Sequence, residues 1–384
     1  MRNRCDVAVI GAGVIGCSVA FHLARRGRRG VAVLEAEPLP GSGSTSKANG
    51  GIRAQFTTEI NLRMSLLSME ILDRLEAEIG EPPLYRKAGY LFVTDSDEKL
   101  ASMAKAADFQ RARGVSVEVL DAAGVRRCAP WIGGLPVGGT FGGRDGFIDP
   151  GGLANWLLSA AVRGGVQPLY GARVEAIERL GSGEFLLVTP TGEWLAPVVV
   201  NAAGPHAASI AAFLGVEVPV APVRRHILVS GPCRELPATI PMTIDADTGI
   251  LIRREGERVV IAYSNPDEPS GFNLEFDPEF GERIAEPLER RFPEVAAAGV
   301  DLRRSWVGLY EVTPDHHSIL GEAPGVSGFY LCNGFSGHGV MHAPAAGACI
   351  AELIDTGRCA TVDIAPLALD RFARGAEIHE TMVL

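Results

Sequence analysis

Three glycines near the start of the chain have the spacing of a dinucleotide-binding turn. Gly11, Gly13 and Gly16 form GxGxxG between the apolar run 6–10 and a helical pattern. In such a turn the first glycine allows a tight bend, the second lets the backbone approach a pyrophosphate, and the third lets helix and strand pack closely. Glu35 follows about 20 residues later, where a carboxylate binds an adenosine ribose hydroxyl and disfavours a 2′-phosphate. The pattern therefore predicts a pyrophosphate at a helix N-terminus.

Two further glycine turns indicate which dinucleotide binds. Residues 198–205, VVVNAAGP, add a second strand and turn far along the chain, which favours FAD over NAD. Gly334, Gly337 and Gly339 form a turn in front of a helix expected over 340–353. The amides and the positive dipole end of that helix would stabilise the negative charge of a reduced flavin.

Arg53 is the candidate for binding an anionic substrate. It lies in an apolar, glycine-rich segment, where a charged side chain needs a reason to be present. A guanidinium binds a carboxylate through two parallel hydrogen bonds and stays charged, although an ordinary surface arginine is the alternative. His316, His317 and His342 lack the spacing of metal ligands and have no acidic partners arranged around them, so no metal is expected.

The chain has 384 residues, which is more than one hydrophobic core usually accommodates. This length and the pattern of strands, helices and turns predict two domains. Apolar positions at helical spacing predict a long helix over 62–79 that stops at Gly80. We predict an α/β (α+β two-domain) fold with a Rossmann-type FAD-binding domain and a second, mainly antiparallel β-sheet substrate domain. The FAD-binding domain is expected to be discontinuous, over 1–88, 145–220 and 304–384, with the substrate domain over 89–144 and 221–303.

Composition excludes several other classes of protein. The formal net charge of −10 disfavours a nucleic-acid-binding face. The seven cysteines are scattered without CxxC spacing, which disfavours a disulfide framework or a zinc site and fits a reducing cytoplasm. No uninterrupted apolar stretch of about 18 residues occurs, so no membrane span is expected.

Five motifs together resemble the D-amino-acid oxidase and glycine oxidase superfamily, within it the branch of sarcosine oxidase, dimethylglycine dehydrogenase and the proline dehydrogenase β-subunit. They are DVAVIGAGVIGCSVAFHLARRG at the start, GGIRAQF at 50–56, VVNAAG at 199–204, GLYEVTPDHHSILG at 308–321 and NGFSGHGVMHAPAAG at 333–347. The resemblance spans nearly the whole chain. It implies FAD-dependent oxidation of a small secondary-amine amino acid (sarcosine, N-substituted glycine or proline type) by hydride transfer to flavin N5, giving an imine.

The same resemblance implies the site residues, without assigning a catalytic acid or base. The substrate would contact Arg53, Tyr263, Tyr310 and His338. FAD would be bound by Gly11, Gly13, Val14, Ile15, Gly16, Glu35, Ala36, Ser44, Thr45, Gly50, Gly51, Ile52, Arg173, Val174, Ala203, Gly204, Gly308, Gly334, Gly337, His338, Gly339, Val340 and Met341.

Departures from the family pattern bear on the cofactor and the electron acceptor. Gly308 stands where monomeric sarcosine oxidase has its flavin-linking cysteine, and the stretch STSKANGG has no histidine, so FAD is expected to be noncovalent. Met341 stands where a second cation holds the substrate carboxylate, which leaves Arg53 alone or with Arg225 or Arg253. Val260 replaces a lysine that promotes the reaction with oxygen, so either oxygen or another electron acceptor is expected.

Other functions remain open from the sequence. The chain could be a D-amino-acid or glycine oxidase, a subunit of a heteromeric amino-acid dehydrogenase, or a noncatalytic FAD-binding assembly protein. A partner subunit or a homo-oligomer is compatible with each of them.

Overall fold

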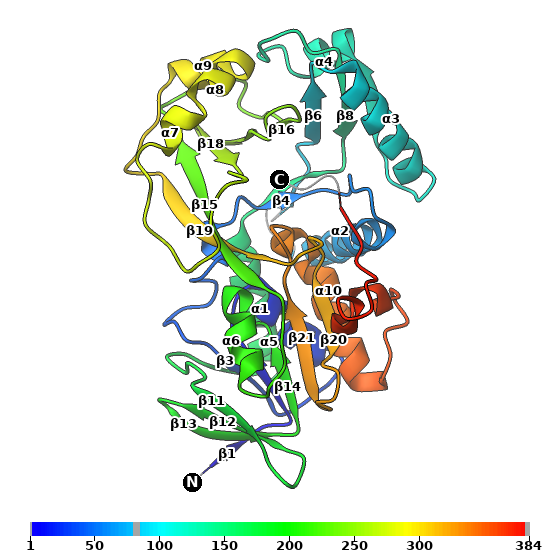
Figure 1. Ribbon diagram of the computed structural model, residues 1–384, viewed down its shortest axis with the longest axis vertical. Coiled ribbons are helices and arrows are strands. Elements are labelled where there is room, and N and C mark those ends of the chain that lie inside the picture. Colours follow the sequence, from blue (N-terminus) through cyan, green and yellow to red (C-terminus); the bar gives the residue numbers. More distant parts are fainter. Residues whose placement is uncertain (1, 80–84, 381–384) are drawn as a thin grey trace.

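A six-stranded sheet forms the centre of the lower half of the molecule (Figure 1) in the computed structural model, which describes residues 2–79 and 85–380. Gly80, the expected end of the long helix, lies outside the described residues. Five neighbouring strands are parallel and β20 pairs antiparallel at one edge. In spatial order the strands are β10 (Gln167–Leu169), β3 (Val31–Leu34), β2 (Val7–Ile10), β14 (Val198–Asn201), β21 (Phe329–Asn333) and β20 (Ile319–Glu322).

Both faces of this sheet are apolar, because β2 and β3 are continuous apolar runs rather than alternating ones. Val7, Val9, Val31 and Val33 belong to the core shared with the helices α1 (Val14–Arg25), α2 (Glu59–Ile79), α5 (Pro150–Arg163) and α10 (Gly339–Thr356). Ala8, Ile10, Ala32 and Leu34 face a second core, shared with α6 (Ala207–Ala212) and the four-stranded sheet of β1 (Asn3–Arg4), β13 (Gly192–Ala196), β12 (Phe185–Thr189) and β11 (Ala176–Arg179).

The upper half contains an eight-stranded sheet (Figure 1). All its strand pairs are antiparallel except the parallel pair β16–β6. The order is β19 (Trp306–Val312), β15 (Ala221–Val229), β18 (Arg258–Tyr263), β17 (Leu251–Glu255), β16 (Met242–Asp245), β6 (Tyr90–Thr94), β8 (Gly138–Gly142) and β7 (Glu118–Asp121). Its helices are α3 (Asp97–Arg111), α4 (Ala122–Cys128), α7 (Phe280–Arg283), α8 (Ala285–Arg291) and α9 (Pro293–Ala297).

β19 lies in the range 304–384, which the predicted division assigns to the FAD-binding domain. Residues 306–312 pair along their whole length with 221–227 of β15 and therefore form an edge of the upper sheet. Backbone pairing joins the strand to the upper sheet, and near its end the Glu311 carbonyl accepts a 3.0 Å hydrogen bond from the Ser336 amide in the turn before α10. The domain boundaries themselves stay a prediction.

Two small elements connect the halves. One is the three-stranded sheet of β4 (Gly51–Ile52), β9 (Gly146–Ile148) and β5 (Tyr85–Arg86). The other is the 3₁₀ turn η1 (Thr45–Lys47), whose last carbonyl accepts a 3.0 Å hydrogen bond from the indole of Trp306. Of the helices within residues 2–79 and 85–380, none combines the length and the apolar character needed to cross a bilayer.

A segment close to the C-terminus completes the start of α2. The carboxylate of Glu380 accepts hydrogen bonds from the backbone amides of Thr57 (2.9 Å) and Thr58 (3.2 Å) in front of that helix. Negative charge at a helix N-terminus satisfies free amides and complements the helix dipole. The segment is anchored by a buried ion pair in which Arg371 donates to Asp315 at 2.8 Å.

Candidate active site

The glycine turn between β2 and α1 is built for close backbone contacts. Gly11 has φ +99°, a conformation that residues with a Cβ rarely adopt. A Cβ on Gly16 would lie 1.9 Å from the carbonyl oxygen of Gly11, so only glycine lets α1 start this close to the strand. Glu35, at the end of β3, accepts the amide of Ala12 at 2.5 Å. Its carboxylate therefore already lies against the turn.

Space in front of this turn fits the pyrophosphate of FAD. A Cβ on Gly13 would meet only the Thr45 hydroxyl, at 3.4 Å, and one on Gly204 would meet nothing within 4 Å. Thr45 also accepts the amide of Val14 at 2.9 Å, which places η1 across the start of α1. The residues present are compatible with the cofactor, since a helix N-terminus and open glycines lie together.

Most of the predicted FAD residues surround the carboxyl ends of the central strands. Ala203 and Gly204 follow β14, and the Gly11 Cβ position is 2.6 Å from the Ala202 carbonyl oxygen, so both turns touch. The segments next to these turns contain Ile15, Ala36, Ser44 and Ile52. The Ala172 amide donates a hydrogen bond to the Glu35 carbonyl, which places Arg173 and Val174 beside Glu35. Arg173 is exposed, 3.9 Å from Glu37. Their roles toward FAD stay predictions.

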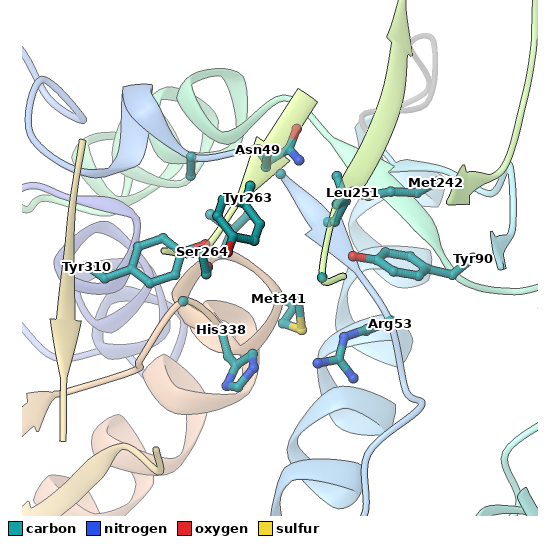
Figure 2. A pocket seen from close by; sticks show the side chains of 17 residues that line it. Asn49, Arg53, Tyr90, Met242, Leu251, Tyr263, Ser264, Tyr310, His338 and Met341 are labelled. Atoms are coloured by element: carbon teal, nitrogen blue, oxygen red, sulfur yellow. The ribbon is translucent and has the colours of Figure 1, made fainter. Parts of the chain in front are cut away.

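The four predicted substrate residues line one cavity, with about 660 Å³ of empty space including part that opens to solvent. Arg53 and Tyr90 lie on one side of it and Tyr310 and His338 on the other (Figure 2). The lining residues are Ala48, Asn49, Gly50, Gly51, Arg53, Tyr90, Met242, Gly249, Leu251, Ala262, Tyr263, Ser264, Tyr310, Gly337, His338, Val340 and Met341. They come from both halves of the molecule.

Arg53 is a fully buried cation, with 1% of its surface exposed. Its guanidinium lies 4.0 Å from the centre of the Phe56 ring and donates to the carbonyl of Gln55. Burial lowers the pKa of Arg53, but a guanidinium remains charged in proteins. The cavity therefore offers a fixed positive charge in an apolar wall, where attraction to an anion is little screened by water.

Tyr310 forms the opposite wall, and its ring packs directly against the backbone of Gly337. A Cβ on Gly337, which has φ +91°, would lie 2.5 Å from the Tyr310 ring. Burial raises the pKa of the Tyr310 phenol, and the nearby charges of Arg225 and Arg53 act against that rise. The phenol is thus neutral and lies in the field of both arginines.

His338 and His342 are neutral side chains beside Arg53. Burial, together with the charge of Arg53, lowers the pKa of His342 to about 3 and that of His338 well below its usual range. His342 shares a 3.0 Å hydrogen bond with Ser65, and the His338 ring lies edge-on to Phe56 at 5.0 Å. Neither imidazole competes with Arg53 for an anion.

The start of α10 points into the same cavity. Its N-cap is His338, its first turn has no acidic residue, and Val340 and Met341 line the cavity. The helix runs from Gly339 to Thr356, so its positive dipole end faces the space between Tyr310 and Arg53. Such a terminus suits a group that gains negative charge on reduction.

The sequence-based prediction does not include a buried hydrogen-bond network around Asp145, close to Arg53. Asp145 is buried and accepts hydrogen bonds from the Ala54 amide (3.1 Å) and the Gln55 side chain (2.9 Å). Thr140 donates to the other end of the Gln55 amide at 2.8 Å. Burial raises the pKa of Asp145 to about 7. Gln55 stands in the GGIRAQF motif, but nothing in the pattern marks Asp145, about 90 residues away.

We expect Asp145 to make anion binding at Arg53 pH-dependent. Because its pKa is about 7, the carboxyl is mostly neutral below pH 7 and adds a negative charge near Arg53 above it. We expect the Kd of a non-titrating carboxylate, (methylthio)acetate, to rise about fivefold from pH 6 to pH 8, corresponding to about 1 kcal/mol of repulsion. Flavin absorbance titrations measure this Kd.

The variant Asp145→Asn is expected to bind the same ligand with a Kd that hardly changes over this pH range. Glu311, whose pKa burial also raises to about 7, accepts the amide of Gly334 at 3.0 Å and provides the rival explanation. If the Kd of Asp145→Asn still rises between pH 6 and pH 8, then Glu311, and not Asp145, causes the pH dependence.

The structure distinguishes the two arginines considered as a second cation. Arg253 donates to Asn49 at 3.1 Å and forms a 2.6 Å ion pair with Glu255, so its charge is compensated. It pairs across the sheet with Val260, where the resemblance leads us to expect a lysine, so the Arg253 and Val260 side chains share a face. Arg225 lies instead over the Tyr310 ring, with its guanidinium carbon 5.1 Å from the ring centre.

Known proteins resemble this chain in sequence and in fold. A family model of FAD dependent oxidoreductases matches residues 6–353. FAD-dependent oxidoreductase domain-containing protein 1 of Xenopus laevis is 30% identical in an alignment 421 residues long that covers 96% of this chain and 83% of the relative. Mitochondrial sarcosine dehydrogenase of Mus musculus is 28% identical over 377 residues, 93% of this chain and 40% of the relative.

Among solved structures, L-proline dehydrogenase from P. horikoshii superposes with a TM-score of 0.91 at 26% identity and covers 98% of this chain and 99% of that one. The likeness confirms the expected fold class of a parallel FAD-binding sheet joined to a mainly antiparallel second sheet. It also fits the expected branch of the superfamily. The chain belongs to the family of FAD-dependent oxidoreductases that includes D-amino-acid oxidase.

Proposed function

We propose that this protein oxidises a small amino acid whose amine is secondary, such as sarcosine, another N-substituted glycine or proline. The observation that carries the proposal is one cavity lined both by a buried guanidinium and by the N-terminus of α10. FAD, when bound, supplies the acceptor for the hydride. The names of two relatives, sarcosine dehydrogenase and L-proline dehydrogenase, support this substrate class.

The residues of the cavity have binding and orienting roles in this reaction. Arg53 binds the substrate carboxylate and so fixes the carbon that carries the amine. His338 and Tyr310, both neutral, position the amine without adding charge to the cavity. The first turn of α10 stabilises the negative charge that develops on reduction. No side chain is assigned as a general base.

The test is anaerobic bleaching of the flavin absorbance by sarcosine, dimethylglycine, L-proline, iminodiacetate, glycine and D-alanine. Rapid bleaching by an N-substituted amino acid or proline supports the proposal, and preferential bleaching by glycine or D-alanine would favour a primary-amine oxidase instead. Admission of air then distinguishes an oxidase, whose colour returns rapidly, from a dehydrogenase. No bleaching by any compound would reject the amino-acid assignment.

FAD is proposed to be noncovalent. Gly308 has no side chain to link, and a Cβ there would lie 2.6 Å from the Cβ of Lys47, so the position is also crowded. We expect acid precipitation to release all of the flavin into the supernatant, where its absorbance and mass identify free FAD. Flavin that stays with the denatured protein would show a covalent link, and peptide mapping would locate it.

A further inference from the structure

Arg225 lies on the cavity face of the ribbon formed by β15 and β19. It pairs with Gly308, and Val223 pairs with Tyr310. Directly paired residues of antiparallel strands share a face, as do residues two apart on one strand. Arg225 and Tyr310 therefore point to the same face, and Tyr310 lines the cavity. Gly308 has no side chain of its own, and the side chain of Lys47 lies against this position.

The charge of Arg225 is not compensated by the described part of the chain. Its guanidinium donates only to the carbonyl of its neighbour Arg224, at 3.0 Å, and its buried Nε has no hydrogen-bond partner among the described residues. Glu268, the acidic residue near it, is already paired with Arg224 at 2.7 Å. A partly buried cation of this kind favours an anionic ligand.

Arg53 lines the cavity, whereas Arg225 is not one of its lining residues and lies against the Tyr310 ring. Arg53 lies across the cavity from Tyr310 (Figure 2), and Arg225 lies over the Tyr310 ring at 5.1 Å. A substrate with a single carboxylate uses one of them.

We propose that Arg225 is a specificity-determining residue that binds a second carboxylate, so that the preferred substrate is a secondary amine carrying two acidic groups. This inference rests on the proposed function for its oxidation step but not for its binding step. The carboxylate at Arg53 fixes the reacting carbon, and the second carboxylate, on the N-substituent or on the side chain, forms a charge-assisted hydrogen bond with Arg225.

The test compares iminodiacetate with its monoamide, which has the same shape but lacks one charge. In the wild-type holoenzyme, we expect the rate of anaerobic flavin reduction divided by Kd to be about tenfold to 100-fold higher for the diacid, as for one charge-assisted hydrogen bond. Arg225→Gln should lose this preference while its value for the monoamide stays within about twofold, and Arg225→Lys should keep part of it. The exposed Arg303→Gln serves as the matched charge control.

A second pair separates this inference from the proposed function. Thiodiacetate and its monoamide have no amine to oxidise, and their Kd values follow from the shift of the flavin absorbance. A preference for thiodiacetate that disappears in Arg225→Gln supports the second carboxylate site even if no amine bleaches the flavin. An equal preference in the wild type and Arg225→Gln, or an equal loss for both members of a pair, would overturn it.

Discussion

Replacing Arg53 by Gln should lower the rate of flavin reduction by sarcosine, divided by Kd, by about 100-fold or more. A bidentate pair of charge-assisted hydrogen bonds supplies about 3 kcal/mol or more, and each 1.4 kcal/mol changes the ratio tenfold. Gln keeps a donor for the Gln55 carbonyl but has no charge. Arg53→Lys should be intermediate, since an ammonium provides a point charge without the planar fork. Stopped-flow anaerobic reduction measures both variants.

Sarcosinamide provides the control for Arg53. Its carboxylate is replaced by an amide, so it should react slowly with the wild type and lose little further in Arg53→Gln. The FAD content of each variant is measured beside it, because Arg53 is buried against Phe56 and a general loss of structure would affect both compounds. A similar loss for sarcosine and sarcosinamide would show that Arg53 supports the fold rather than the carboxylate.

Gly16→Ala should abolish most FAD binding and lower the free energy of unfolding by about 3 kcal/mol, the upper range for overpacking a well-packed core. The new Cβ would lie 1.9 Å from the Gly11 carbonyl oxygen and 3.4 Å from Val9. The Gly11 carbonyl is backbone and cannot move as a flexible side chain would, whereas the contact with the Val9 side chain is an ordinary one. The start of α1 must therefore shift away from the place proposed for the pyrophosphate.

Flavin content after purification and the denaturant midpoint without FAD measure these two effects. Gly181→Ala is the matched control, since a Cβ at that exposed position meets nothing within 4 Å and its backbone has no positive φ. It should leave both measurements unchanged. Full FAD content in Gly16→Ala would show that the α1 N-terminus is not where the cofactor binds.

The sequence predicts local features well because their causes are local. GxGxxG followed by Glu35 requires a strand, a turn and a helix in order, and the structure forms them at 7–10 and 14–25. The helix after the 334–339 turn is likewise local, and it begins one residue earlier than expected, at Gly339. The long helix begins at Glu59, because Thr57 and Thr58 are capped by Glu380, which no local pattern could reveal.

The remaining parts of the site depend on contacts between distant segments. Tyr90, Met242 and Leu251 line the cavity through the register of strands in the upper sheet, and their sequences are ordinary apolar strands. The same holds for Arg225, whose importance follows from its pairing with Gly308 rather than from its neighbours. β-Strand register is set by pairing over long separations, so single-sequence patterns cannot supply it.

The order of strands in the central sheet has a consequence for synthesis on the ribosome. β2 lies between β3 and β14, and about 190 residues separate it from β14 in the chain. At translation rates of about 5–20 residues per second, the edge of β2 remains unpaired for about 10–40 s after it emerges. The amide of Thr57, in front of α2, remains without its acceptor for longer still, because Glu380 follows more than 300 residues later. We therefore expect the nascent chain to depend on chaperones that cover β2 until β14 arrives.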